Sequence, residues 1–256
     1  MVRHPACQSV RFRPNIFGTL FYASAILLAR PMVHLLPLLK STLLVLSALF
    51  PIVNPLGSAP IFFSLTSYYS SEERKLLSRR IAINSFILLI GSYLIGTHIL
   101  SFFGISIPVV QVGGGLVLVS TGWAILKQKD QTPDSKDGVH GSADLSDLFQ
   151  KAFYPLTLPL TVGPGSISVA ITLGANEPHY ADHILYSIIG AIIGSFLIAI
   201  SVYVCYAFAG RLAQALGATG MNVIMRLSSF LLVCIGVQIM WNGLSGLLKT
   251  LIPLIH

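Results

Sequence analysis

The sequence predicts an all-α integral membrane protein with six transmembrane helices, arranged as two inverted repeats of three helices in which helices 1 and 4 are broken. Three observations lead to this prediction. Apolar residues make up 54% of the chain and charged residues only 10%, against roughly 25% charged residues in soluble domains. Several uncharged stretches reach the ~20 residues that a helix needs to cross a bilayer. One motif rich in proline and glycine occurs twice, each time inside such a stretch.

The apolar stretches divide the chain into two halves. The expected helices cover residues 41–67, 79–102, 105–126, 152–175, 184–209 and 222–248. Residues 32–126 then form the first three-helix repeat and residues 151–256 the second. Residues 127–150 are polar and contain Gly, Ser and Pro, which favours a flexible cytoplasmic linker between the repeats. No room remains for a separate soluble domain.

Residues 1–31 form an extension that precedes the first repeat. Three arginines come before the uncharged run from Asn15 to Leu28, which is too short to span a bilayer. Charge and length fit the first part of a signal peptide, but no clean cleavage site follows. Three interpretations stay open: an artefactual or dispensable extension from a start codon placed too early, an interfacial or seventh hydrophobic segment, and a true signal.

The basic residues predict the orientation in the membrane. The net charge is +7, but Lys and Arg lie in the connections between spans rather than on one face, so we expect no nucleic-acid binding. Connections 103–106 and 176–183 contain none of them, whereas ten lie in the other connections: Arg74, Lys75, Arg79, Arg80, Lys127, Lys129, Lys136, Lys151, Arg211 and Arg226. The positive-inside rule makes that side cytoplasmic. Both ends of the six-helix core then face outward, and three helices per half make the second half inverted.

The repeated motif interrupts helices 1 and 4. With an offset of 108 residues, three positions of the first copy match the second: Pro51 with Pro159, Gly57 with Gly165 and Ser58 with Ser166. Proline and glycine break helices, and hydrocarbon cannot satisfy the freed backbone groups. Such breaks therefore occur only where they are buried in protein or line a wet cavity. Paired interruptions in two halves are typical of a transporter built from repeats.

Each interruption creates a helix N-terminus near the bilayer midplane. Its free N–H groups and partial positive charge suit a carboxylate. The candidate substrate-binding residues are Asn54, Pro55, Gly57, Ser58, Gly163, Pro164, Gly165, Ser166 and, in the glycine-rich part of helix 3, Gln111. The alternative interpretation is structural, because prolines kink helices and small residues pack them together. For the three glycines after Gln111, packing is the favoured role.

The sequence offers little other chemistry. No predicted span holds Asp or Glu away from its ends, so coupling would use sodium held by backbone carbonyls, protons carried by a histidine such as His98, or no ion. Arg226 is interpreted as an interface anchor. Cys7, Cys205 and Cys234 lack paired spacing, which predicts neither a disulfide nor a metal site. Without HExxH, Walker or CxxC motifs, we expect no enzyme and no cofactor.

Three separated motifs carry a family resemblance. Residues 49–62 resemble the first-helix signature of the MarC family of bacterial inner-membrane proteins, residues 161–167 its fourth-helix signature and residues 234–243 its last helix. The match runs from about Met32 to the C-terminus, and residues 1–31 depart from the family pattern. The resemblance implies six helices in the bacterial inner membrane, transport of small neutral amino acids and a fold related to LysE-type exporters.

Residues and resemblance lead to the same functional hypothesis. We expect transport of small neutral amino acids such as glycine or alanine, by rocking of the two halves around a midplane site. A non-transporting membrane module and an efflux protein for drugs or metabolites are the alternatives. The expected partners are a small-molecule substrate and the lipid bilayer, and a homo-oligomer is compatible with the sequence.

Overall fold

A computed structural model describes residues 16–127, 149–176 and 181–251, and over these ranges it is all helical. Its elements are α1 (Ile16–Val53), α2 (Pro55–Leu65), α3 (Ser71–Phe102), α4 (Ile107–Lys127), η1 (Ala152–Thr161), α6 (Pro164–Ala175), α7 (Ala181–Ala207) and α8 (Ala209–Leu251). Five spans are long and apolar enough to cross a membrane, or six if the bent pair η1–α6 counts as one. The prediction of an all-α membrane protein is therefore confirmed at this level.

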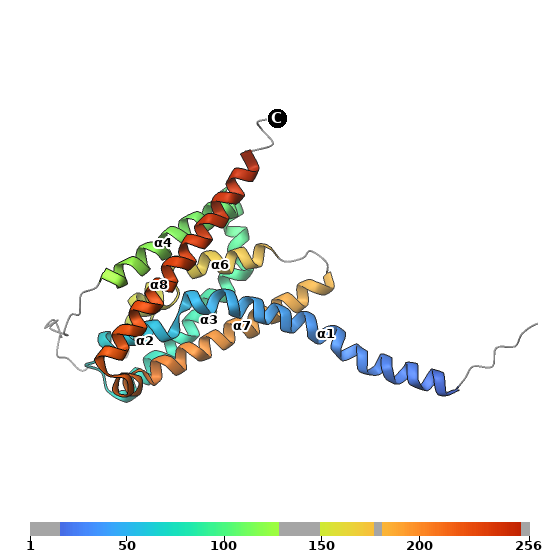
Figure 1. Ribbon diagram of the computed structural model, residues 1–256, viewed down its shortest axis with the longest axis horizontal. Helices are drawn as coiled ribbons and strands as arrows, with labels where there is room; N and C mark the ends of the chain where they lie inside the picture. The colour runs from blue at the N-terminus through green and yellow to red at the C-terminus, as the bar shows by residue number, and fades with distance from the viewer. Residues whose placement is uncertain (1–15, 128–148, 177–180, 252–256) are drawn as a thin grey trace, which may run out of the picture.

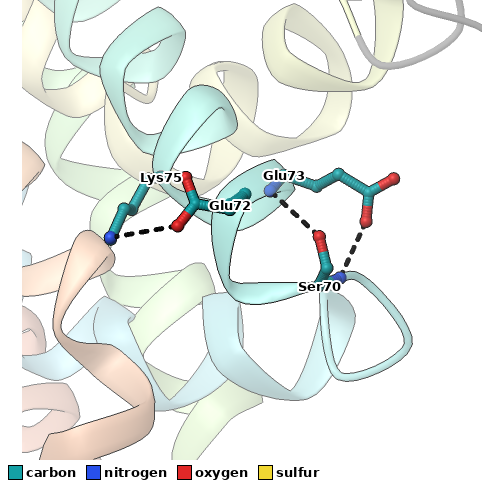
Figure 2. Close-up of polar contacts among 4 residues, drawn as sticks. All are labelled: Ser70, Glu72, Glu73 and Lys75. Carbon is teal, nitrogen blue, oxygen red and sulfur yellow. Dashed lines mark hydrogen bonds and ion pairs between the residues drawn. The ribbon is translucent and has the colours of Figure 1, made fainter.

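The start of α3 differs from the prediction. The helix begins at Ser71, eight residues before the predicted start at residue 79. Ser70 and Glu73 form a capping box, in which the Glu73 N–H donates to Ser70 Oγ at 3.2 Å and the Ser70 N–H donates to Glu73 Oε2 at 2.7 Å. Lys75 pairs with Glu72 at 3.4 Å (Figure 2). This charged first turn continues the helix beyond its apolar part, because the cap satisfies its end.

The start of α8 differs in a similar way. The helix begins at Ala209, whereas the apolar pattern begins at residue 222. Between them the backbone leaves helical geometry at Gly217, which has φ 65 and ψ 177. The left-handed φ favours glycine at this position. Hydropathy identified the more apolar part of α8, and the prediction omitted the preceding turns, which contain Arg211, Gln214 and several small residues.

The helices form an elongated bundle from which α1 projects (Figure 1). α8 packs along α4, α1 along α7, and α3 against both α7 and α6. The turn between α2 and α3, the end of α4 and the turn between α7 and α8 gather at one end of the bundle (Figure 1). Arg74, Lys75, Lys127 and Arg211 lie at or near these connections, whereas Arg226 lies inside α8. Many large apolar side chains remain exposed on the outer surface of the bundle, as expected for helices that face lipid.

Glycines bring α4 and α8 into backbone contact. A Cβ added to Gly115 would lie 2.6 Å from the Gly236 carbonyl oxygen, and one added to Gly236 would lie 2.8 Å from the Gly115 carbonyl oxygen. Gly122 and Gly243 follow after two turns on the same faces and meet the backbone of the opposite helix. Close van der Waals packing of this kind holds helices together in lipid, where the hydrophobic effect does not drive them together.

Candidate functional site: the two helix interruptions

The first interruption lies at Asn54, between α1 and α2. Asn54 has φ 47 and ψ 59, a left-handed conformation that asparagine tolerates better than most residues. Its side-chain Oδ1 accepts the Gly57 N–H at 3.1 Å, and its carbonyl accepts the Ser58 N–H at 3.0 Å. The Pro51 carbonyl loses its helical partner, because the residue four positions later is Pro55, which has no N–H.

The second interruption lies between η1 and α6, where the chain bends by 70°. η1 is a π-helix that contains Pro155 and Pro159. Its wide spacing is visible at its end, where the Val162 N–H donates to the Thr157 carbonyl at 2.9 Å. Gly163 then precedes α6 in extended conformation, and Pro164 opens the helix. π-helical turns inside longer helices are frequent at functional sites.

The two new helix N-termini differ in capping. Asn54 caps α2 with its side chain, whereas Gly163 gives α6 no side-chain cap. Ser166 does not cap it either, since its hydroxyl donates to the Gly163 carbonyl at 2.9 Å. Gly163 is partly exposed and Pro164 is exposed. Of the two ends, that of α6 therefore keeps more of its capacity to bind an anion.

Both motif glycines lie at helix contacts. A Cβ on Gly57 would lie 2.5 Å from Ser228 Cβ and 2.7 Å from Ser228 Oγ on α8, and one on Gly165 would overlap the Leu118 side chain on α4. Each interrupted segment thus rests on one helix of the α4–α8 pair. These contacts give the glycines a packing role, whatever role they have toward a ligand.

Gln111 and Gly114 lie against α6, Gln111 away from its start. Gln111 Nε2 donates to Thr172 Oγ1 at 3.4 Å. Thr172 follows Pro164 by eight residues, which is about 12 Å of helix rise. Gly114 packs on Ser168 of α6, Gly115 packs on α8, and Gly113 has no heavy atom within 4 Å of an added Cβ. The structure therefore brings Gln111 to α6 but not to the α6 N-terminus.

Tyr206 of α7 connects the two interruptions, and sequence reasoning missed it. Its side chain is only 1% exposed. The hydroxyl lies 2.9 Å from Thr161 Oγ1, at the end of η1, and the Ser58 side chain of α2 lies nearby. The ring stacks on Phe62 of α2, with centroids 4.4 Å apart and planes 9° apart. One buried side chain thus contacts both η1 and α2.

A cavity of about 180 Å³ lies next to this junction. Residues from the end of α2 and the start of η1 line it: Leu65, Thr66, Tyr68, Tyr69, Lys151, Pro155 and Leu156. Lys151 Nζ lies 3.5 Å from the Tyr69 hydroxyl. The cavity lining includes none of the residues proposed from the motifs. Its lining residues Thr66, Tyr68 and Tyr69 belong to the turn between α2 and α3, which lies at the end of the bundle where the basic connections gather (Figure 1).

The structure contains several apolar helices long enough to span a membrane, and two of these segments are interrupted. This architecture defines a multi-pass integral membrane protein. A family model described as MarC family integral membrane protein matches residues 39–248. The inner membrane protein MarC of Escherichia coli O1:K1 / APEC is 32% identical over 221 residues, which are 84% of this chain and 99% of that relative. The same-named protein of Salmonella paratyphi B is 32% identical over 219 residues, with the same coverage. The chain belongs to the MarC family, and no solved structure matches it.

Proposed function

We propose that this protein transports small neutral amino acids across the bacterial inner membrane, by alternating access around a site at the two helix interruptions. The observation that carries the proposal is the junction at Tyr206, where one buried side chain bonds to Thr161 beside one interruption and stacks on Phe62 of α2, the helix that begins at the other. Irregular backbone at membrane depth is tolerated only in protein or beside a wet cavity, and in repeat-built transporters it binds substrate. The relatives' name supports the inner-membrane location.

Helix contacts support an inverted repeat of 3+3 helices with broken helices 1 and 4. An interrupted segment followed by two long helices occurs twice along the chain, as α1/α2, α3, α4 and as η1/α6, α7, α8. A two-fold axis would exchange the contact of α1 with α7 for that of η1 with α3, and the contact of α2 with α8 for that of α6 with α4. All four contacts are present. The α4–α8 pair would lie on the axis.

Helix lengths support a site near the bilayer midplane. α2 has 11 residues and α6 has 12, which give about 16 and 18 Å of rise. The hydrocarbon layer of a bilayer is ~30 Å thick. Each interruption therefore lies about half of that thickness from the far end of its helix. With the basic connections in the cytoplasm, both ends of the six-helix core are periplasmic.

The chemistry of the interruptions fits a zwitterion without a charged side chain. The Gly165 and Ser166 N–H groups at the start of α6 suit a carboxylate, and the Pro51 carbonyl near the end of α1 suits an ammonium group. Residues 51–60 and 159–168 contain no charged residue, so they offer no partner for an ionic substrate side chain. The protein acts as a transporter rather than an enzyme, and sodium and protons are the coupling ions to be tested.

Ligand-induced stabilisation of the purified protein tests the substrate class. We expect glycine and alanine to raise the unfolding temperature in a saturable way, with about 2.7 kcal/mol of stabilisation at 100 times Kd. Acetate and ethylamine, which each carry half of the zwitterion, should stabilise much less, as should glutamate and lysine. Equal effects of all six compounds, or no effect of glycine and alanine, would contradict the proposed site and favour a non-transporting membrane module or another substrate.

A further inference from the structure

Residues of the Tyr206 junction are hydrogen-bonded to residues that line the cavity between α2 and η1. Thr66, which lines the cavity, donates from Oγ1 to the Phe62 carbonyl at 2.7 Å. Leu156, on the other wall, accepts at its carbonyl the hydroxyl of Thr161 at 2.7 Å. Phe62 and Thr161 are the residues that Tyr206 contacts. Each wall of the cavity is thus one hydrogen bond away from the Tyr206 junction.

The junction closes the path from the cavity to the interruptions. Phe62 is 0% exposed, Tyr206 1% and Thr161 2%. Val162, which follows Thr161 and precedes the α6 N-terminus, is also 0% exposed. Because these four residues are buried, no open channel along them leads from the cavity to Val162. Tyr206 of a third helix, α7, contacts residues of both α2 and η1, which also contact each other directly.

We propose that Tyr206 is the cytoplasmic gate residue of this transporter. In the closed state its ring stacks on Phe62 and its hydroxyl bonds to Thr161. In the open state both contacts separate, and the cavity becomes continuous with the interruptions. This inference rests on the proposed function for its orientation and its role. It adds a gate residue outside both repeated motifs.

Cysteine accessibility in membrane vesicles tests the gate without any substrate. The reporter is Val162→Cys in the full chain, with Cys7, Cys205 and Cys234 replaced by alanine. A membrane-impermeant maleimide is applied to inside-out vesicles, which expose the cytoplasmic face. We expect Tyr206→Phe, which keeps the ring and removes the hydroxyl, to raise the labelling rate roughly fivefold, the equivalent of one net hydrogen bond. Thr161→Val, which removes the other hydroxyl, should do the same.

Two controls make the result specific. Tyr203→Phe removes a hydroxyl from the same helix at a side chain that is 38% exposed, and it should leave the rate unchanged. A Tyr68→Cys reporter, which lines the cavity and is 65% exposed, should label equally fast with and without the Tyr206 hydroxyl. Size-exclusion chromatography of each variant checks folding. If Tyr206→Phe is not folded by this check, the labelling rate measured in Thr161→Val tests the gate instead.

The outcomes separate this inference from the proposed function. An unchanged rate in folded Tyr206→Phe and Thr161→Val overturns the gate. An equal rise in right-side-out vesicles also overturns it, because general loosening opens both faces. A rise in right-side-out vesicles alone overturns the cytoplasmic assignment. A rise from the cytoplasmic face alone supports the gate even if glycine and alanine fail to bind, a result that would overturn only the proposed substrate.

Discussion

Replacing Gly115 with alanine is expected to destabilise the folded protein by about 1–3 kcal/mol, the usual cost of forcing extra atoms into a packed interior. The added Cβ would lie 2.6 Å from both the Gly236 carbonyl oxygen and the Met240 backbone nitrogen of α8. Backbone atoms cannot move aside as a flexible side chain can, so α4 and α8 must separate. Thermal unfolding of the detergent-solubilised protein measures the loss.

Gly113→Ala is the matched control on the same helix. Gly113 is exposed, and an added Cβ meets no heavy atom within 4 Å. Alanine is the better helix former, so this variant should be neutral or more stable by up to about 1 kcal/mol. Gly236→Ala should reproduce the loss of Gly115→Ala from the opposite helix. Equal unfolding temperatures for Gly115→Ala and Gly113→Ala would contradict the close α4–α8 contact.

Replacing Gly57 with alanine is expected to abolish transport and to reduce stability, for two separable reasons. The added Cβ would lie 2.5 Å from Ser228 Cβ on α8, which damages packing. It would also stand beside Asn54, where the proposed ligand approaches the backbone. The loss of stability alone should again be about 1–3 kcal/mol. Unfolding temperature and uptake into liposomes measure the two effects on one protein preparation.

A second substitution separates these two reasons. Ser228→Gly removes one of the two side chains that a Cβ at Gly57 would strike, the other being that of Asn54. In the double variant we expect part of the lost stability to return, less the roughly 1 kcal/mol that a glycine costs inside a helix. Transport should stay absent, because the methyl group still occupies the ligand side of the interruption. Recovery of transport together with stability would show that Gly57 serves packing alone, and it would remove Gly57 from the site.

The spans were predictable from the sequence because hydropathy and charge place them directly. Five of the expected segments agree with helices of the structure, and the remaining one corresponds to the bent pair η1–α6. The predicted ends were less accurate where turns of lower hydropathy extend a helix. At Ser70 a capping box stabilises such a turn, and α8 begins at Ala209 with turns that contain Arg211, Gln214 and several small residues. Hydropathy alone carries no signal for these turns.

The contacts around the interruptions were only partly predictable. The motif marks where the chain breaks, and Asn54 and Gly163 lie at those places. It does not say that Asn54 caps its own helix, or that Gly57 meets Ser228 on α8, because both facts depend on tertiary packing. Tyr206 carried no distinguishing signal, since α7 also contains Tyr186 and Tyr203. Only its burial between Phe62 and Thr161 sets it apart.

The central claim is that this protein moves small neutral amino acids, and flux measures it most directly. Purified protein in liposomes is given radiolabelled glycine or alanine, with and without proton and sodium gradients. We predict saturable uptake that is driven by one of the two gradients. Excess unlabelled alanine should suppress this uptake, and excess glutamate should not. Absence of flux under every gradient, from protein that is folded and inserted, would contradict the account.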